Sequence, residues 1–455
     1  MFQKLLRLLP EPFASQLAGK DNITRIAANS FWLISDKILR MLVTLFVTGW
    51  LARYLSLNDF GKLNNAIAYA LLFGSFATLG LDSIVIRDIV KYPDQKDRLL
   101  GTSFYLKLVA GFFTYILCVI AVVILRPSAD ETISRHLVYI ISAGTFFQSF
   151  DVIDYYFQSR IQSKYTVLAK NAAFILINAI KIVMIIMHAP LIWFGWAWLF
   201  EMIFNAVGLV IVFRNKGHTV RRWSYDAATA KMILRQSSAI YVAYIASFTY
   251  MKVDQIMIAK MLNDTQAGLF AASAKVYDLC FFIVIVLAPS FYPSLIHIYE
   301  SDRRLFYKRY AQVTDLFTIL GYAVLIFILL FGDWIIRILY GAQFEPSSLV
   351  LKIQIFGMLF MFNGGLRSSY LAITNKQYLL MYTSILTAFL NIALNFVLIP
   401  MKGITGSALA TAISNASAML FFSLLFDGTR NIFWIQIKSL TFQNVIKHLR
   451  KSGYE

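Results

Sequence analysis

Length, composition and charge place this chain in a membrane before any motif is considered. Its 455 residues are 59% hydrophobic and only 15% charged, whereas soluble domains carry a charge at roughly a quarter of their positions. A soluble core of this length would need a larger polar shell than these charged residues can supply. The two cysteines, Cys118 and Cys280, lie in apolar stretches, which argues against both a disulfide framework and a thiolate zinc site.

Apolar runs divide the chain into membrane-spanning segments. A helix needs roughly 20 mostly apolar residues to cross the hydrocarbon layer, and twelve such runs lie between Asn29 and Phe426, separated by short polar joints. Runs such as 112–125 are almost continuously apolar rather than alternating, so the sequence predicts an all-α integral membrane protein with 12 transmembrane helices. The predicted spans are 30–54, 60–81, 99–125, 136–157, 165–187, 190–213, 237–262, 266–294, 310–331, 349–373, 378–399 and 404–426.

The distribution of Lys and Arg predicts the orientation of the chain. Cytoplasmic loops carry an excess of these residues, and the odd-numbered loops hold only Arg126, Arg135, Arg337 and Lys402 of the 42 basic residues. Both termini are therefore expected in the cytoplasm. Basic loops beside anionic lipid headgroups also account for most of the net charge of +18, so no nucleic-acid partner is expected.

A weak internal duplication groups the spans into two sets of six. One shift along the sequence aligns 51–55 with 258–262 and Gly61 with Gly268. Because six is an even number, the two halves enter the membrane with the same polarity, and we expect an axis along the membrane normal with a substrate cavity between two pseudo-symmetric lobes. The predicted organisation is a cytoplasmic N-terminal segment 1–28, an N-lobe 29–213, a basic cytoplasmic linker 214–236, a C-lobe 237–426 and a cytoplasmic C-terminal segment 427–455.

Charged residues inside the predicted spans need an explanation, since each costs at least about 2.5 to 3.5 kcal/mol at a helix centre. For some of these residues, a neighbouring opposite charge or contact with the lipid headgroups is a sufficient explanation. Asp36 with Arg40, and Lys275 with Asp278, have helical spacings at which they can neutralise each other, which leaves structural and functional roles equally open. The basic residues close enough to span ends to reach the headgroups are Arg53, Lys62, Lys260 and Lys352.

Basic residues outnumber acidic ones in the spans, and Lys107, Lys181 and Lys252 lie deepest. A cavity with surplus positive charge suits a phosphate or another anion. No GxxxxGK[ST] sequence for nucleotide hydrolysis occurs, so transport energy is expected from an ion gradient or from the substrate gradient, and no cofactor is expected beyond a coupling H⁺ or Na⁺. Carboxylates that could bind that ion, or act as counter-ions for the cations, are Asp36, Asp154 and Asp254.

Several segments resemble the polysaccharide-biosynthesis flippases of the Wzx type. The first half carries ARYLSLNDFG at 52–61 and GLDSIVIRD at 80–88, and the second carries KVDQIMIA at 252–259, GLFAAS at 268–273 and PMKGITGSA at 400–408. The resemblance implies the MATE-like fold of the MOP superfamily, with two six-helix lobes that alternate between inward-open and outward-open states. It also implies that the protein is not an enzyme.

The resemblance further implies a function in the bacterial inner membrane. Wzx-type proteins move an undecaprenyl-pyrophosphate-linked oligosaccharide, such as an O-antigen repeat unit, from the cytoplasmic to the periplasmic leaflet. The implied partners are this glycan, membrane lipid, a polysaccharide polymerase and a chain-length regulator. The candidate residues for binding the pyrophosphate and any acidic sugars are Lys37, Arg40, Lys107, Lys181, Lys252 and Arg367.

Three alternatives to this function are open at this stage. The same superfamily contains cation-coupled multidrug antiporters, some of which bind the coupling ion in the region of Asp36, although they typically carry fewer basic residues. It also contains lipid II flippases, which would be expected to have two further spans. A scaffold for glycan assembly that transports nothing is the third hypothesis.

Overall fold

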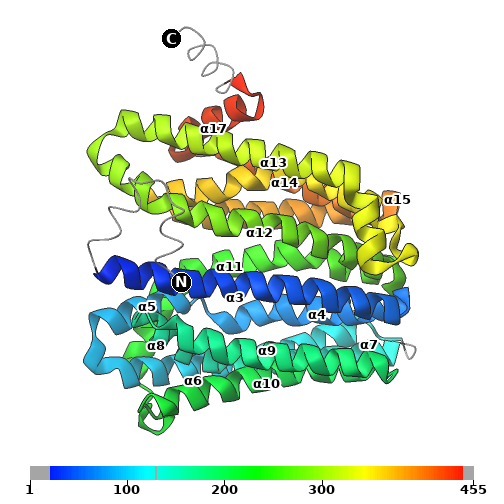
Figure 1. Ribbon diagram of the computed structural model, residues 1–455, viewed down its shortest axis with the longest axis horizontal. Helices are drawn as coiled ribbons and strands as arrows, with labels where there is room; N and C mark the ends of the chain where they lie inside the picture. Colours follow the sequence, from blue (N-terminus) through cyan, green and yellow to red (C-terminus); the bar gives the residue numbers. More distant parts are fainter. Residues whose placement is uncertain (1–20, 129–130, 444–455) are drawn as a thin grey trace. The chain divides into compact units, whose positions relative to one another are not determined.

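The computed structural model describes residues 21–128 and 131–443, and these residues form helices joined by short turns, with no strand among them (Figure 1). The predicted all-α class is confirmed. The α-helices are α3 Asp21–Tyr54, α4 Leu57–Thr78, α5 Asp82–Lys91, α6 Lys96–Leu125, α7 Thr132–Ser142, α8 Val152–Ser159, α9 Ser163–Ile186, α10 Leu191–Asn215, α11 Ala227–Met261, α12 Asp264–Ser301, α13 Arg303–Tyr340, α14 Pro346–Ile373, α15 Tyr378–Met419, α16 Phe421–Leu425 and α17 Asp427–Leu440. The 3-10 helices are η1 Pro93–Gln95, η3 Ala143–Asp151, η4 Val220–Arg222 and η5 Ala342–Phe344.

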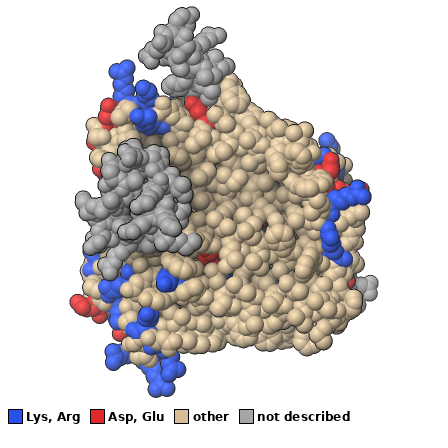
Figure 2. Space-filling view, viewed as in Figure 1, with Lys and Arg blue, Asp and Glu red and all other residues tan. Residues whose placement is uncertain are grey.

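The outer surface of the helices is apolar, as a lipid environment requires. Large hydrophobic side chains of the long helices are exposed, including Phe113 at 65%, Ile186 at 70% and Phe389 at 73%. On the face drawn in Figure 2, Lys and Arg gather near helix ends and most of the remaining surface is uncharged. In water such a surface would be an aggregation liability, whereas hydrocarbon solvates it. The protein is a multi-pass membrane protein.

Among the described residues, nine helical stretches are long and apolar enough to cross a membrane. The first and seventh predicted spans lie within α3 and α11, which have 34 and 35 residues but carry more charge. The last two predicted spans form one stretch, Tyr378–Leu425, which comprises α15 and α16. α15 bends where Gly403 adopts φ 60° and ψ −141°, three residues after Pro400. This bend falls between the two predicted spans. The total of twelve spans stays a prediction.

Contacts group the chain into two compact units. Among the described residues, unit 1 comprises 21–48, 76–121 and 138–238, and unit 2 comprises 49–75, 122–137 without 129–130, and 239–443. In unit 1, α9 packs on α10 and α8 packs on α5, and in unit 2, α14 packs on α12, α13 and α15 (Figure 1). The chain passes from unit 1 to unit 2 for the last time after Ser238, two residues beyond the predicted linker. The predicted lobe boundaries remain a prediction.

The aligned glycines of the duplication touch each other in unit 2. A Cβ atom on Gly61 would collide with the carbonyl oxygen of Asp264, and one on Gly268 would collide with that of Leu57 and lie 3.1 Å from the backbone nitrogen of Gly61. The shift that aligns Gly61 with Gly268 also aligns Leu57 with Asp264. Such reciprocal contacts are what a two-fold relation between repeats produces. This close approach of α4 and α12 requires glycine at both positions.

Short joints, the segments that connect consecutive helices, come from both halves of the sequence and meet near this glycine pair. Arg126, which follows α6 and is 2% exposed, donates two hydrogen bonds to the Asp264 carboxylate, at 2.9 and 2.6 Å. Phe60 packs edge-on against Phe344 with ring centroids 5.3 Å apart. The side-chain amide of Gln343 donates to the carbonyl oxygen of Ala52 at 3.0 Å. We call these contacts, together with the glycine pair, the joint cluster.

The described part of the predicted C-terminal segment is largely helical. α17 is helical to Leu440 and packs on α13 and α16. The hydroxyls of Thr318 and Ser439 lie 2.8 Å apart, and Tyr322 donates to the carbonyl oxygen of Leu440 at 3.1 Å. Residues 444–455 lie outside the described part of the chain, as do residues 1–20 of the predicted N-terminal segment. Residues 21–28 of that segment belong to α3.

Candidate functional site

Unit 1 holds a charge network on α6, η3, α8 and α9. The Lys107 side chain is 2% exposed, and its Nζ atom lies 3.1 Å from the hydroxyl of Tyr155 and 3.9 Å from the carboxylate of Asp151. Lys170 contacts both Asp151, at 3.2 Å, and Asp154, at 2.9 Å. Two ammonium groups therefore offset two carboxylates. A network balanced in this way is stable in a low-dielectric interior, where an unpaired charge is not.

A 3-10 segment brings Asp151 to Lys107. In η3 the hydroxyl of Thr145 donates to the carbonyl oxygen of Ser142 at 2.8 Å. Such local bonds compete with α-helical pairing, so the tighter i to i+3 turn is favoured here. Gly111, one turn after Lys107 on α6, lets η3 approach, because a Cβ atom there would lie 3.0 Å from the Thr145 carbonyl oxygen.

A second group of charges in unit 1 joins α3, α9 and α10. Arg40 contacts Asp36 at 2.8 Å and Glu201 at 4.0 Å, and Lys181 contacts the other oxygen of Glu201 at 3.5 Å. The Arg40 guanidinium also lies 4.8 Å from the ring centroid of Phe174. Two cations again meet two carboxylates. The i,i+4 pairing of Asp36 with Arg40 predicted from the sequence is present.

The remaining lysine candidates differ in their surroundings. Lys37 on α3 is exposed. Lys252 on α11 lies 3.6 Å from the Asp278 carboxylate of α12, beside a small cavity of about 70 Å³ in unit 2 that Asn64 and Gln255 also line. Asp278 therefore contacts a cation on another helix, in addition to having Lys275 at the i,i+3 spacing on its own helix.

Asp254 on α11 is 5% exposed and is held by neutral donors. The side-chain amide of Asn395 donates to one carboxylate oxygen at 2.8 Å, and the hydroxyl of Thr411 donates to the other at 2.6 Å. The same Asn395 amide also reaches the side-chain oxygen of Asn391 at 3.1 Å. No Lys or Arg of the described chain lies within 4.0 Å of this carboxylate. Hydrogen bonds from neutral groups, and no ion pair within the described chain, therefore hold this carboxylate.

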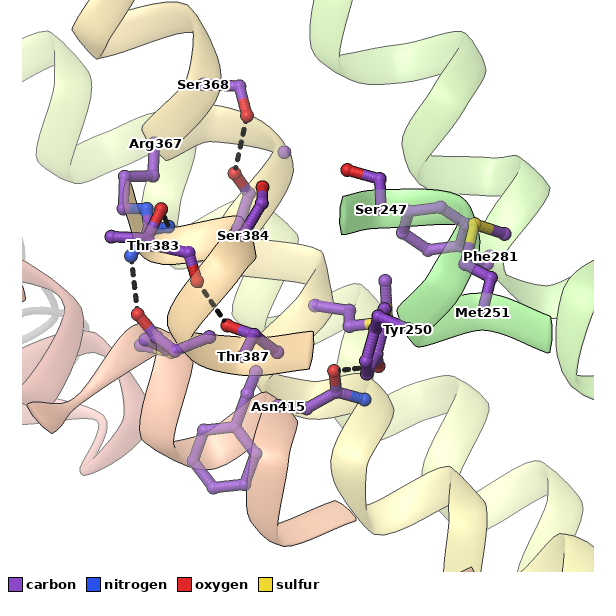
Figure 3. Close-up of a pocket in the computed structure, with 16 residues that line it drawn as sticks. Ser247, Tyr250, Met251, Phe281, Arg367, Ser368, Thr383, Ser384, Thr387 and Asn415 are labelled. Atoms are coloured by element: carbon purple, nitrogen blue, oxygen red, sulfur yellow. Dashed lines mark hydrogen bonds between the residues drawn. The ribbon is translucent and has the colours of Figure 1, made fainter. Parts of the chain in front are cut away.

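Arg367 on α14 has the opposite character, a buried cation without a carboxylate. The residue is 8% exposed. One of its Nη atoms donates to the carbonyl oxygen of Ala418 and lies 3.3 Å from the Ser423 hydroxyl, and the other donates to the Thr383 hydroxyl at 2.9 Å. Its Nε atom is buried and finds no acceptor among the described residues. Figure 3 shows Arg367 and Thr383 at the wall of a cavity in unit 2.

The linker between α10 and α11 contains titratable groups outside the spans. Burial lowers the pKa of His218 below its usual value of 6.5, and its ring nitrogen lies 2.9 Å from the hydroxyl of Tyr156. The hydrogen bond from the Thr229 side chain lowers the pKa of Asp226. Asp226 also accepts from the backbone N–H of Thr229 at 2.7 Å, which caps the start of α11.

The structure sorts the predicted binding residues into two units. Lys37, Arg40, Lys107 and Lys181 belong to unit 1, and Lys252 and Arg367 belong to unit 2. Within the described chain, all but Lys37 and Arg367 contact a carboxylate. That these cations share one chamber stays a prediction.

Several partners were missing from the predicted set. The largest omission is Lys170, which offsets both Asp151 and Asp154. Glu201, which contacts both Arg40 and Lys181, was also absent from the predicted carboxylates. The helical spacing of Asn391 and Asn395 was a usable signal for an amide pair on one helix face.

Comparison with known proteins now identifies the family. The family model described as polysaccharide biosynthesis protein matches residues 50–349, about two thirds of the chain. The chain belongs to this family. The resemblance found in the sequence is thereby confirmed at the level of the family. A curated relative, the capsular polysaccharide biosynthesis protein CapF of Staphylococcus aureus, is 22% identical over 169 residues, 37% of this chain. The match spans 43% of that relative's length.

Solved structures share the fold at low sequence identity. An inward-facing multidrug resistance MATE family transporter of the MOP superfamily is 13% identical with a TM-score of 0.72, over 89% of this chain and 96% of that chain. The lipid II flippase MurJ is 16% identical with a TM-score of 0.68, over 92% of both chains. A MOP superfamily transporter from Pyrococcus furiosus is 14% identical with a TM-score of 0.62, over 93% and 97%. The predicted MATE-like fold is confirmed, and these neighbours are transporters and flippases rather than enzymes.

Proposed function

We propose that this polysaccharide biosynthesis protein is a flippase for a lipid-linked glycan. It moves an undecaprenyl-pyrophosphate-linked oligosaccharide, an O-antigen or related repeat unit, from the cytoplasmic to the periplasmic leaflet of a bacterial inner membrane. The observation that carries the proposal is the set of charged side chains buried in the membrane helices of a member of this family. A protein that only anchored an assembly complex would gain nothing from these residues, since each buried charge costs free energy.

The physical task fits the arrangement of the charges. A glycan headgroup is polar and its diphosphate is anionic, so a path through hydrocarbon must offer hydrogen bonds and cations. Ion pairs such as Lys181 with Glu201 and Lys252 with Asp278, at 3.5 and 3.6 Å, are loose enough to exchange partners. A phosphate can replace the carboxylate on the lysine without creating an uncompensated charge, because the released carboxylate can be solvated by the water that enters with the sugar.

We assign different roles to the three candidate carboxylates. Asp36 and Asp154 contact Arg40 and Lys170 at 2.8 and 2.9 Å, so they act as counter-ions. Asp254 has only neutral donors, so it is the group that binds the coupling H⁺ or Na⁺. Carboxylate and hydroxyl oxygens are ligands that hard cations prefer.

Alternating access gives the joint cluster a role in transport. On the predicted orientation, the joints that contribute Phe60, Arg126, Asp264 and Gln343 face the periplasm. The contacts between them, including the Arg126 to Asp264 ion pair, close that side. Release of the glycan into the periplasmic leaflet then requires that these contacts separate.

Gene deletion and reconstitution test the proposal. A host that depends on this gene should lose its surface polymer on deletion and accumulate the lipid-linked repeat unit on the cytoplasmic side. Purified protein in liposomes should expose a labelled lipid-linked oligosaccharide to an external glycosidase. Lys181→Ala and Lys252→Ala should slow this step, while Lys352→Gln, which breaks an ion pair with the 66%-exposed Asp333, should not.

Two results would contradict the proposal. If deletion leaves polymer export unchanged but removes efflux of cationic dyes, the protein is a multidrug antiporter. If translocation of the repeat unit proceeds normally without the protein but polymer assembly fails, the protein is a scaffold. Normal translocation by both alanine variants, at confirmed expression, would remove the two lysines from the site.

A further inference from the structure

A cavity of about 290 Å³ lies within unit 2, between α11, α12, α14 and α15. Figure 3 shows Arg367, Thr383 and Ser384 on one side and Ser247 and Phe281 on the other. Its volume is at the lower end of the range for ligand pockets. It can hold a single small group, not an oligosaccharide.

The lining combines one cation with many neutral polar groups. Among the described residues, Arg367 is the only charged one that lines the cavity, and the carboxamide of Asn415 and six hydroxyl groups line it as well. No Asp or Glu of the described chain lies within ion-pair distance of the Arg367 guanidinium, and its Nε–H has no acceptor there. The residues with hydroxyl groups are Ser247, Tyr250, Ser368, Thr383, Ser384 and Thr387.

An uncompensated guanidinium in a membrane protein is expensive, and other buried or half-buried cations of the described chain avoid that cost. Arg40, Lys107, Lys181 and Lys252 each contact a carboxylate of the protein. Arg367 instead meets carbonyl and hydroxyl oxygens, which carry no net charge. A ligand anion would supply the missing charge, and buried charges without a partner in the protein mark functional sites.

We propose that this cavity binds a monoanionic sugar, a hexuronic acid residue of the transported glycan. The inference rests on the proposed function and narrows its substrate class. One guanidinium balances one carboxylate, whereas a diphosphate carries at least two negative charges and would leave the excess unpaired. The planar fork of arginine also matches a carboxylate in two-point contact.

The rest of the lining fits a pyranose ring. Sugar hydroxyls both donate and accept hydrogen bonds, and the Ser, Thr and Asn side chains of the cavity can do the same. Tyr250, Phe281 and Phe360 supply apolar faces for the C–H side of the ring. Such a subsite would select repeat units with an acidic sugar over neutral ones, because a neutral sugar would leave Arg367 uncompensated.

Gly364 offers a way to test the cavity without disturbing Arg367. It lines the cavity, and a Cβ atom at this position would meet no atom within 4 Å. Gly364→Leu therefore places a side chain in the cavity and leaves the hydrogen bonds of Arg367 in place. The neighbouring Gly365 is unsuitable, because a Cβ atom there would lie 2.6 Å from Val284.

Calorimetric titration of the purified full-length protein tests the proposal. The probes are methyl glucuronide, methyl glucoside and inorganic pyrophosphate. We expect the wild type to bind the glucuronide at least about tenfold more tightly than the glucoside, as loss of a charge-assisted contact implies. Arg367→Gln and Gly364→Leu should each weaken glucuronide binding at least about tenfold, Arg367→Lys should weaken it less, and Lys352→Gln should leave it unchanged.

The outcomes separate this proposal from the proposed function. Three results would each overturn the assignment: glucuronide binding that survives both Arg367→Gln and Gly364→Leu, the absence of glucuronide binding, or pyrophosphate binding that is tighter than glucuronide binding and is lost in Arg367→Gln. Loss of glucuronide binding in both variants, with elution profiles like the wild type, supports it. Export of polymer after gene deletion is measured separately, and a flippase that exports normally with both variants retains its function while the subsite is rejected.

Discussion

The Arg126 to Asp264 ion pair provides the sharpest test of how burial determines the strength of an electrostatic contact in this protein. Asp264→Ala removes both hydrogen bonds to a guanidinium that is 2% exposed. Removal of one partner from a buried ion pair costs about 3 to 5 kcal/mol, because the other charge stays buried without compensation. Asp264 also lies in the first turn of α12, where a carboxylate contributes about 0.3 to 1 kcal/mol through the helix dipole.

One contact reduces the expected loss. Glu131 lies 3.7 Å from Arg126 and is 29% exposed, so it can take over part of the interaction. We therefore expect a loss near the lower end of the range, about 3 kcal/mol. Replacing both charges, in Arg126→Met with Asp264→Leu, should recover most of it, because apolar side chains of similar volume need no compensation.

Reversible unfolding in mixed micelles measures these free energies. The matched control is Asp333→Ala, which breaks the Lys352 to Asp333 pair. Its N to O distance of 2.6 Å equals the shorter one of the buried pair, but Asp333 is 66% exposed, so the expected loss is at most about 1 kcal/mol. Equal losses in Asp264→Ala and Asp333→Ala would refute the reasoning, and so would failure of the double replacement to recover stability.

Three further predictions follow from other parts of the structure. Gly61→Ala should destabilise the protein by about 1 to 3 kcal/mol in the same unfolding assay, because the added methyl group would collide with backbone atoms. Gly364→Ala should be neutral or stabilising, because its Cβ atom would lie in open space. Burial lowers the pKa of His218, so its neutral form stabilises the folded state above pH 6.5, and this contribution is lost as the pH falls through the folded pKa. The free energy of unfolding between about pH 7 and pH 5 should therefore depend less on pH in His218→Gln than in the wild type. An equal pH dependence in the two proteins would exclude this role. Asp254→Asn should abolish the dependence of glycan translocation on an imposed H⁺ or Na⁺ gradient in liposomes while the protein still inserts, and a variant that still responds to the gradient would place the coupling ion elsewhere.

The sequence predicted those features that depend on local composition. The helical class follows from runs of apolar residues. The bend in α15 follows from Pro400, which lacks a backbone N–H donor, and from Gly403, which can adopt a positive φ. The i,i+4 contact between Asp36 and Arg40 follows from helix geometry alone. The family could be identified because its motifs are contiguous stretches of residues.

The partners of the charged residues were decided only by the tertiary structure. Lys181 and Glu201 are twenty residues apart on α9 and α10, and Arg126 meets Asp264 across more than a hundred residues. Helical spacing says which side chains share a face, but not which face of another helix lies opposite. The same limit explains why the sequence could place Arg367 in a predicted span but could not show that it lacks a carboxylate partner, since that property depends on every helix packed around it.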